Sequence, residues 1–339
     1  MKYRIITHGN CTDGYCSAFV VKKFFNVFFR TTLTNQEIQE IPVLGVQPQD
    51  IQAGKVHFSS RDIVVDLPLL QRAKVLFWCD HHLTTKPTAE LPADFYWKAA
   101  PSCTGLLIDI ALEKGAKATK ELLEFKKAID IIDNAEYSKK DIQSCFYKQK
   151  NYQPPTSLQK LTMVGAMFST RDRVLNDEIF RTLLANELGE TPLSSKSLWL
   201  LNPLMFHKAQ LESFEQWRKN VDTYLSYDKE AQCVLQDDRL AKITIGVPDR
   251  FYSYIKFPQA SYHLNLRIID EEKKARLGIG SNIFHKERCK VDISELCREV
   301  GKKFGGSGGG HFAVGGAVVK AERADEAIKF ILGRLKEKH

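Results

Sequence analysis

Asp80, His81 and His82 form the part of the sequence best suited to chemistry. They follow an apolar run, residues 73–79, that has the length and composition of a β-strand. In an open α/β sheet, the carboxyl ends of the strands present the ligand-binding groups. A carboxylate beside two imidazoles offers the oxygen and nitrogen ligands that suit divalent ions such as Mn²⁺ and Mg²⁺. The sequence therefore predicts a metal site at the end of this strand.

Two other predicted strands also end in acidic residues. Residues 3–7 read as a strand that runs into a polar loop with His8 and Asp13, and an apolar helix follows the loop. A β-branched run ends at Asp66. An ordinary turn around Asp13-Gly14 is the alternative explanation of the first loop. Three successive strand ends of this kind, however, favour a shared site at one edge of a parallel sheet.

A fourth acidic group lies at the end of an amphipathic helix that we expect over residues 120–132. Asp130 and Asp133 are three positions apart, which places them near each other on one helix face. Carboxylates at a helix C-terminus oppose the helix dipole and need a positive partner. A solvated helix end is the alternative, and a metal held by Asp133 or Asp130 would serve as the partner.

The second half of the chain changes its pattern. From residue 157 to about residue 227, the spacing of apolar residues predicts helices and shows no chemistry. After residue 228 the pattern predicts strands at residues 231–235, 241–247, 262–269, 276–279 and 317–320, and helices at residues 292–300 and 324–336. This change indicates a second domain that follows a helical segment.

A glycine-rich stretch lies between the last predicted helices. Five of the six residues before His311 are glycine, among them Gly308, Gly309 and Gly310. A loop of this composition lets a ligand approach the backbone closely, and adjacent N–H groups can hold an anion. A flexible linker is the alternative. We expect His311 to add a donor, and Arg267 on an earlier strand to pair with a phosphate.

Length, charge and cysteine usage narrow the class of protein. The 339 residues suffice for two domains, and no apolar stretch reaches 18 residues, so a membrane span is not expected. No secretory leader is visible, and eight scattered cysteines without a CxxC pair read as reduced thiols, so we expect a cytoplasmic protein. The net charge of +8 suits a polyanionic partner, although a charge of this size also occurs without one.

Together these residues suit metal-assisted hydrolysis of a phosphoester in a cleft between two domains. A bound metal would activate water and hold a phosphoryl oxygen, and two metals would clamp the attacking and leaving oxygens. His82 would orient or stabilise the phosphoryl group, and we assign His82 and Asp80 to catalysis.

At this point the chain resembles the DHH phosphoesterase family, in the branch with the DHH-associated C-terminal domain. The matching segments are His8–Gly14, Val64–Asp66, Asp80–His82, Asp130–Asp133 and the glycine-rich Gly308–Gly316 with His311. The resemblance implies an α/β fold with an N-terminal parallel-sheet DHH domain, a helical connector and a smaller C-terminal α/β substrate-binding domain. We place these parts at residues 1–190, 191–228 and 229–339.

The resemblance also implies a Mn²⁺ site, with two ions expected and Mg²⁺ as an alternative ion. By position, Asp66 would bridge the two metals. Asp13, His81 and the Asp of the fourth motif would bind one metal, and His8 would bind the other.

One position departs from the family pattern. Many members have a second Asp two residues before the Asp of the Asp-Gly pair, whereas this chain has Cys11 there. Asn10, Cys11 or water would then complete that metal site, or the site is weak. A thiolate would favour softer ions such as Zn²⁺.

The resemblance leaves several functions open. The first is hydrolysis of phosphodiester bonds in short oligonucleotides, as in nano-RNases and exonucleases. The second is a phosphomonoesterase acting on 3′-phosphoadenosine 5′-phosphate, or a polyphosphatase. The third is a nucleotide-binding protein with an impaired metal site and no catalysis. The expected partners are a short oligonucleotide or a nucleotide phosphate and, as one assembly, a second copy in a homodimer.

Overall fold

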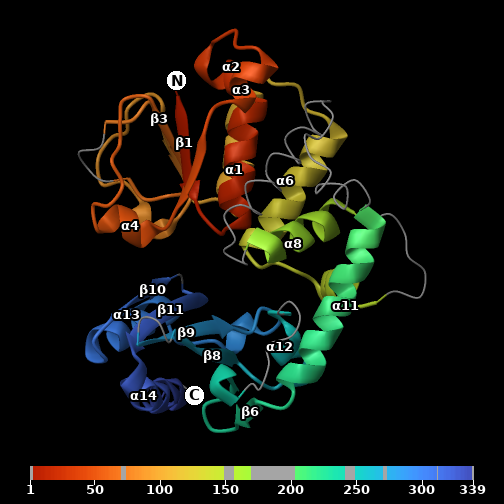
Figure 1. The fold of residues 1–339 in the computed structure, drawn as a ribbon, viewed down its shortest axis with the longest axis vertical. Coiled ribbons are helices and arrows are strands. Elements are labelled where there is room, and N and C mark those ends of the chain that lie inside the picture. The colour runs from red at the N-terminus through yellow and green to blue at the C-terminus, as the bar shows by residue number, and fades with distance from the viewer. Residues whose placement is uncertain are drawn as a thin grey trace. The chain divides into compact units, whose positions relative to one another are not determined.

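The computed structural model describes residues 3–69, 74–148, 156–168, 203–240, 249–269, 273–310 and 312–337. The chain divides into two compact units (Figure 1). The first unit contains Met1–Tyr137 and Gln149–Ala209, and the second contains Ser138–Lys148 and Gln210–His339. His311, the strand predicted at residues 241–247 and the first part of the predicted connector lie outside the described residues. None of the helices in the described ranges is long and apolar enough to cross a membrane.

The first unit is built on a five-stranded, fully parallel sheet with the strand order β2-β1-β3-β4-β5. The strands are β1 (Arg4–His8), β2 (Val43–Val46), β3 (Asp62–Val65), β4 (Phe77–Asp80) and β5 (Phe95–Trp97). The parallel sheet expected from the sequence is confirmed, although β5 was not predicted and β4 is shorter than expected. Because all strands run the same way, their carboxyl ends meet at one edge.

Seven helices of the described residues belong to the first unit. They are α1 (Thr12–Lys23), α2 (Phe25–Phe29), α3 (Asn35–Gln39), α4 (Pro48–Gln52), α5 (Cys103–Glu113), α6 (Lys120–Asp133) and α8 (Ser157–Phe168). Several of them begin at capping residues. The Thr34 hydroxyl caps α3, while the Ser102 hydroxyl accepts from the Gly105 N–H and the Thr119 hydroxyl accepts from the Leu122 N–H. The last two caps fix the starts of α5 and α6, the two helices that complete the site described below.

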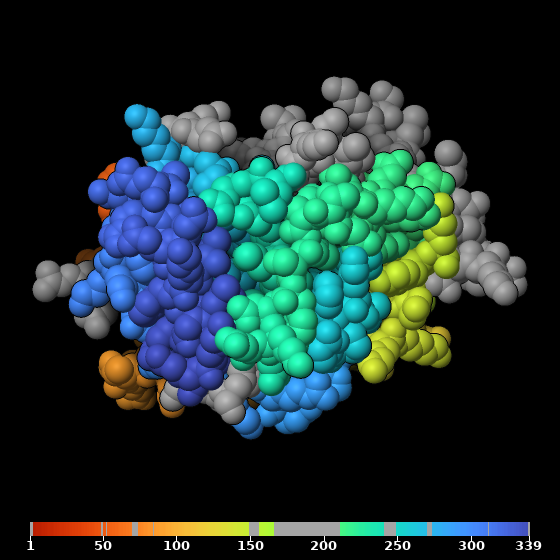
Figure 2. Space-filling model, turned by 90° about the horizontal axis from the view of Figure 1, so that it is seen from below, coloured from red at the N-terminus to blue at the C-terminus, as the bar shows by residue number. Residues whose placement is uncertain are grey.

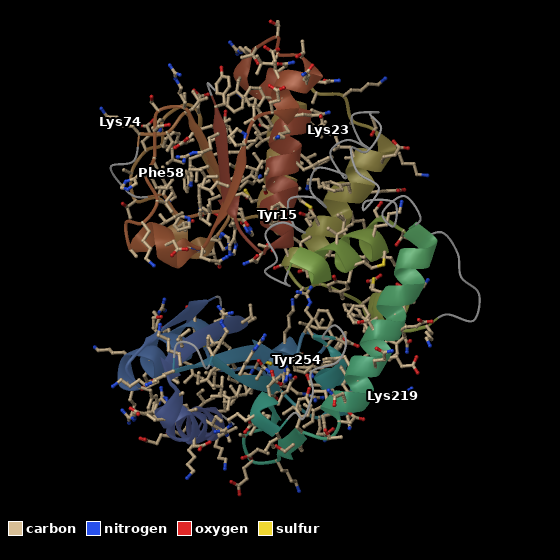
Figure 3. The ribbon with its side chains drawn as sticks, viewed as in Figure 1. Tyr15, Lys23, Phe58, Lys74, Lys219 and Tyr254 are labelled. Carbon is tan, nitrogen blue, oxygen red and sulfur yellow. The ribbon has the colours of Figure 1, made fainter. Side chains whose placement is uncertain are left out.

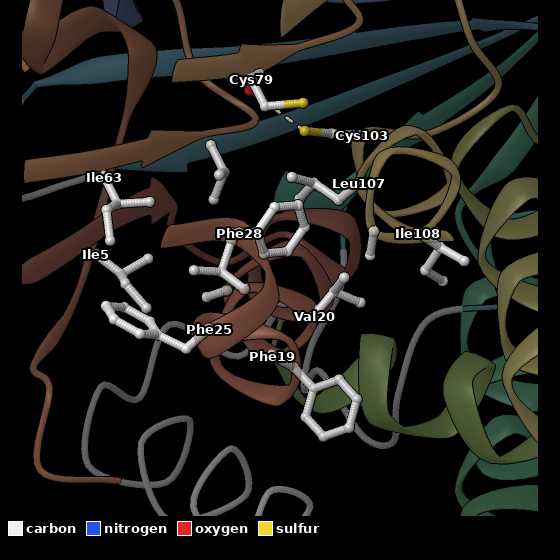
Figure 4. Packing of buried hydrophobic residues seen from close by; sticks show 14 of the residues in the cluster. Ile5, Phe19, Val20, Phe25, Phe28, Ile63, Cys79, Cys103, Leu107 and Ile108 are labelled. Carbon is white, nitrogen blue, oxygen red and sulfur yellow. Dashed lines mark hydrogen bonds between the residues drawn. The ribbon is translucent and has the colours of Figure 1, made fainter. Parts of the chain in front are cut away.

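The core of the first unit lies between the sheet and helices α1 and α5 (Figure 4). Ile5 and Ile63 of the strands are fully buried, and so are Val20 of α1 and Leu107 of α5. Burial of such a side chain contributes about 1.5–3 kcal/mol relative to exposure. This packing fixes α1 on the sheet, and therefore fixes the loop that carries His8 into the helix.

That loop is also held by contacts with the neighbouring strand β2. The Gly9 N–H donates to the Val46 carbonyl at 2.8 Å, and the Gln47 amide donates to the Gly9 carbonyl at 2.8 Å. The Tyr15 hydroxyl, near the start of α1 (Figure 3), lies only 3.2 Å from where a Cβ on Gly45 would sit. A side chain at position 45 would therefore press on this hydroxyl and on Gly9 Cα, which lies 3.0 Å from the same point.

The second unit contains a six-stranded sheet with the order β10-β11-β9-β8-β7-β6. The strands are β6 (Leu225–Asp228), β7 (Cys233–Asp237), β8 (Tyr262–Ile269), β9 (Lys274–Ser281), β10 (Ser307–Gly310) and β11 (Val314–Lys320). Only the β7–β8 pair is parallel among these strands. Helices α13 (Ile293–Lys303) and α14 (Ala324–Lys336) bury their apolar faces on one side of the sheet. Figure 2 shows α14 in blue beside the green segment near β6, where Lys336 pairs with Glu230 at 2.8 Å.

Two predictions for this half of the chain were wrong. Residues 225–227 were expected in a helix, but α11 (Pro203–Val221) ends earlier and β6 follows it. The glycine-rich stretch was expected to be a loop, but Ser307–Gly310 forms the edge strand β10, which pairs antiparallel with β11. Glycine weakens an isolated strand, so the pairing with β11 overrides the local preference here.

The segment Ser138–Lys148 is anchored in the second unit by a buried cluster. It contains α7 (Lys139–Phe146), and the Phe146 ring packs on Phe214 of α11 with the ring centroids 4.9 Å apart. The Arg218 guanidinium donates to the Phe146 carbonyl at 3.0 Å and to the Asp249 carboxylate at 2.9 Å. The Asp249 side chain is fully buried, so this ion pair supplies the charge partner that a buried carboxylate needs.

Candidate metal centre

The carboxyl edge of the parallel sheet gathers the residues that the sequence singled out. His8 is the last residue of β1, Asp66 follows β3, and Asp80 ends β4. Within the described residues, three groups of side chains offer ligand atoms that lie within 4.8 Å of one another. These groups are Asp13 with His81 and Asp133; His8 with Cys11 and Asp66; and Asp66 with Asp80, His81 and His82.

The first group converges on the imidazole of His81. Its Nε2 atom lies 3.4 Å from Asp133 Oδ2, 3.6 Å from Asp13 Oδ2 and 3.5 Å from Asp66 Oδ1. Its Nδ1 atom lies 2.9 Å from the Ala100 carbonyl oxygen, which can only accept a hydrogen bond. Nδ1 therefore carries a proton, and Nε2 is the ring atom left for a metal.

The second group involves the other carboxylate oxygen of Asp66, which is Oδ2. Asp66 Oδ2 lies 3.5 Å from Nδ1 of His8, and the Cys11 sulfur is the third ligand atom of this group. The two oxygens of Asp66 thus face two different ligand groups. This is the arrangement that a carboxylate bridging two ions requires.

The buried surroundings of the Asp66 carboxylate favour a bound cation. Its side chain is 1 % exposed, and neither carboxylate oxygen has a hydrogen-bond partner among the residues that the structure describes. His81 Nε2 is likewise buried without a described partner. The Asp66 backbone has φ of +57°, an uncommon conformation for a residue other than glycine. An unpaired buried carboxylate is costly, and one or two divalent ions would satisfy these atoms, so the residues fit a metal.

Asp13 is positioned by the start of helix α5. Its two carboxylate oxygens accept from the backbone N–H groups of Cys103, at 2.7 Å, and Thr104, at 2.9 Å. These N–H groups belong to the first turn of α5, where the helix dipole also favours a negative charge. The Gly14 carbonyl next to it accepts from the Thr7 hydroxyl at 2.5 Å. The carboxylate is therefore fixed from both the strand side and the helix side.

Asp80 holds His82 in place. Its carboxylate accepts from His82 Nδ1 at 2.7 Å, from the His81 N–H at 2.8 Å and from the Thr85 hydroxyl at 2.6 Å. The Trp97 indole N–H donates to the His82 carbonyl at 2.9 Å. Asp80 is fully buried, and these donors make it an orienting residue for His82. Sequence reasoning missed Thr85 and Trp97, because neither belongs to a motif of metal-ligand type.

The two candidates at the end of α6 separate in the structure. Asp133 joins Asp13 and His81, whereas the Asp130 carboxylate accepts from the Ser102 hydroxyl at 2.6 Å and from Lys126 at 3.3 Å. Asp130 therefore supports the residue that caps α5 and is absent from the three ligand groups found among the described residues.

The clustered charges shift the pKa values of the metal-ligand candidates. Burial, and then the Asp66 carboxylate, raises the pKa of Asp13 to about 6, and burial with Asp13 and Asp66 raises the pKa of Asp133. Burial acts to raise the pKa of Asp66, but the imidazoles of His8 and His81 outweigh it and lower that pKa. Burial acts to lower the pKa of His81, but its carboxylate neighbours raise it to about 10. The metal-free cluster thus retains protons that a divalent cation would replace.

Of the residues predicted to bind substrate in the second unit, Arg267 and the three glycines lie on its sheet. Arg267 of β8 is exposed and stands opposite Arg276 of β9, which is exposed as well. Sequence reasoning missed Arg276 because the antiparallel register that pairs it with Arg267 is not visible in the sequence.

Glycines stand opposite one another on the neighbouring strands β10, β11 and β9 of the same sheet. Gly309 stands opposite Gly316 of β11, and Gly316 stands opposite Gly278 of β9. No described atom lies within 4 Å of where a Cβ on Gly278 or Gly309 would sit. Gly278 and Gly309 therefore leave open space beside the backbone, while His311 lies outside the described residues.

Comparisons with known proteins support the fold. Residues 267–337 match the DHHA1 domain. The whole chain superposes on a pGpG-specific phosphodiesterase, PggH from Vibrio cholerae, with a TM-score of 0.67 and 19 % identity, covering 100 % of both chains. It also superposes on the DHH domain of a member of a family of ribosomal proteins, with a TM-score of 0.56 and 12 % identity, covering 99 % of this chain and 87 % of the other. For CDC45 from Entamoeba histolytica the TM-score is 0.52 with 9 % identity, covering 98 % and 95 %. No curated protein sequence matches the chain significantly.

Proposed function

From the fold of the DHH proteins with a DHHA1 domain, which this chain has, we propose that the protein is a metal-dependent phosphoesterase. Its proposed reaction is the hydrolysis of phosphodiester bonds in short oligonucleotides. The proposed ion is Mn²⁺, with two ions per chain, and Mg²⁺ is the alternative. The solved structure with a TM-score of 0.67 is a phosphodiesterase that is specific for the dinucleotide pGpG, which makes a dinucleotide the first substrate to test.

One observation carries the proposal: the two oxygens of Asp66 face two separate ligand groups. Asp13, His81 and Asp133 would hold one ion, and His8 with Cys11 would hold the other. Bound divalent ions supply an activated water and neutralise charge on a phosphoryl oxygen.

The remaining residues of the centre are proposed to position and stabilise the phosphoryl group of the substrate. Oδ1 of Asp80 lies 2.7 Å from Nδ1 of His82 and fixes the orientation of the ring. The ring would therefore present one defined edge to a phosphoryl group. We assign His82 to stabilisation of that group, and Asp80 and Thr85 to holding His82. A carboxylate that orients a histidine in this way raises the basicity of the ring.

In the second unit, two kinds of group suit a phosphate. Arg267 and Arg276 stand opposite each other on adjacent strands and are both exposed, and two guanidinium groups suit a doubly charged phosphate. Gly309 offers backbone that a ligand can approach closely, since no described atom lies within 4 Å of where its Cβ would sit. We retain Gly308, Gly310 and His311 as proposed contacts, although a Cβ on Gly308 would meet the Cys297 carbonyl of α13. These residues are proposed to bind phosphate groups of the substrate.

The test uses Mn²⁺ and labelled pGpG beside di- to pentanucleotides, with release of mononucleotide as the readout. We expect release by the natural protein and a loss of at least about 1,000-fold for Asp66→Asn, because that change removes negative charge from both ligand groups. Asp109→Asn is the matched control, since Asp109 is a 51 % exposed carboxylate on α5. No mononucleotide release by the natural protein, or unchanged release by Asp66→Asn, would contradict the proposal.

The same panel decides between the other functions. Turnover of 3′-phosphoadenosine 5′-phosphate or polyphosphate in place of oligonucleotides would assign a phosphomonoesterase or a polyphosphatase. Fewer than one transition metal bound per chain at saturating Mn²⁺, together with no turnover, would assign a nucleotide-binding protein without catalysis.

A further inference from the structure

Cys11 lies at the start of α1, where its side chain is available as a ligand. It is the residue that precedes the helix, its backbone is extended with φ of −122° and ψ of 134°, and its side chain makes no capping hydrogen bond. The sulfur lies within 4.8 Å of the ligand atoms of His8 and Asp66. Burial and the carboxylates of Asp66, Asp133 and Asp13 raise the pKa of the Cys11 thiol, so a bound cation is what would hold it as a thiolate.

A second and independent observation points to a cation at this place. Asp66 Oδ2, which faces this group, belongs to a side chain that is 1 % exposed and has no described hydrogen-bond partner. The imidazole of His8 lies 3.5 Å from it. A sulfur, a nitrogen and a buried carboxylate oxygen therefore surround one point.

The two ligand groups differ in chemical hardness. The group of Asp13, His81 and Asp133 offers two carboxylates and one imidazole, whereas the group of His8, Cys11 and Asp66 contains the only sulfur found in the ligand groups of the described residues. Carboxylate-rich sites suit Mn²⁺ and Mg²⁺, and thiolates select ions such as Zn²⁺ and Co²⁺.

We propose that Cys11 binds Zn²⁺ as a thiolate together with His8 and Asp66, in place of the second Mn²⁺ of the proposed function, so that the two ligand groups form a mixed-metal centre. The group of Asp13, His81 and Asp133 keeps a harder ion such as Mn²⁺. Binding exchanges the thiol proton of Cys11, which passes to solvent, for a metal–sulfur bond. Asn10 does not compete for this role, since its side chain is exposed and its backbone has φ of +59°.

The test uses Co²⁺ as a spectroscopic substitute for Zn²⁺ in the full-length protein after removal of bound metal with a chelator. A cobalt–thiolate bond absorbs strongly in the near ultraviolet, whereas cobalt bound by oxygen and nitrogen alone does not. We expect this absorption to saturate at one Co²⁺ per chain and to disappear when one equivalent of Zn²⁺ is added. We also expect alkylation of Cys11 by iodoacetamide to be slowed by Zn²⁺ and not by Mn²⁺.

Variants assign the signal to one sulfur. Cys11→Ser is expected to abolish the absorption and to weaken Zn²⁺ binding by at least about 100-fold. Cys11→Asp, which restores a hard ligand, is expected to bind Mn²⁺ in place of Zn²⁺. Cys16→Ala is the matched control, because Cys16 lies in the same helix but is not in a ligand group, and it is expected to keep the absorption.

Circular dichroism spectra of the variants check that each one folds. An absence of the absorption in the natural protein, or its survival in a folded Cys11→Ser variant, would overturn the inference. These readouts do not depend on catalysis, so the outcome stands apart from the proposed function. Hydrolysis of oligonucleotides with Mn²⁺ but without thiolate absorption would remove only the mixed-metal centre. Thiolate absorption without hydrolysis would remove only the proposed function.

Discussion

Replacement of Gly14 by alanine tests whether the short loop between β1 and α1 sets the activity. A Cβ at this position would lie 2.2 Å from the His8 carbonyl oxygen and 3.0 Å from the His8 Cβ. Real Cβ contacts stay above 3.0 Å, so the loop must open by about 0.8 Å. This opening displaces His8 and Asp13, which belong to different ligand groups. A displacement near 1 Å at a catalytic site can cost about 100-fold in rate, which corresponds to about 2.7 kcal/mol in the barrier.

The assay is kcat/KM for pGpG with Mn²⁺, together with the Mn²⁺ affinity from calorimetry. We expect Gly14→Ala to lose about 100-fold in kcat/KM and to bind Mn²⁺ more weakly, while its circular dichroism spectrum stays that of a folded protein. Gly333→Ala is the control, because Gly333 is also helical and no described atom lies within 4 Å of its added Cβ. That variant is expected to keep its activity and to gain up to about 1 kcal/mol of stability. A folded Gly14→Ala protein with kcat/KM within threefold of the natural value would refute the reasoning.

Three further predictions concern other contacts. Thr85→Val removes the hydroxyl that donates to Asp80 at 2.6 Å, so kcat should fall about 10-fold with unchanged Mn²⁺ affinity, and an equal loss of both would contradict an orienting role. Burial lowers the pKa of His263 to about 4, so the unfolded state binds more protons below pH 6.5, and stability should fall by up to about 3 kcal/mol as the pH decreases from 6.5 to 4. Urea unfolding of His263→Phe should lack this part of the pH dependence, and identical pH profiles would argue against it. Arg218→Ala leaves the buried Asp249 unpaired and should cost about 3–5 kcal/mol in urea unfolding, whereas a loss below 1 kcal/mol would show that the ion pair does not matter.

The sequence predicted the first unit better than the second. The apolar runs before His8, Asp66 and Asp80 are short and bounded by polar residues, and they form parallel strands as expected. In the second unit, the edge strand Ser307–Gly310 has no strand-like composition and depends on its pairing with β11. A contact between elements far apart in the chain leaves no signal in the local sequence.

In the site, too, residue types are known from the sequence alone, whereas contacts between distant residues cannot be predicted from it. Residue type and position were enough to select Asp13, Asp66 and His81 as ligand candidates, and the structure brings them together. Asp133 and Asp130 differ in role because the Ser102 hydroxyl donates to Asp130. This hydrogen bond joins two residues that are 28 positions apart in the sequence. No spacing rule on the helix could have distinguished the two.

The anchoring of Ser138–Lys148 in the second unit has a consequence for how the chain can be divided. The chain passes from one unit to the other three times, after Tyr137, after Lys148 and after Ala209. A fragment that begins at residue 229 would lack both α7 and α11, including the Arg218 that partners Asp249. Neither unit is a continuous stretch of chain, so one proteolytic cut cannot release either of them whole. A gene fusion or truncation that respects the fold must therefore keep both units together.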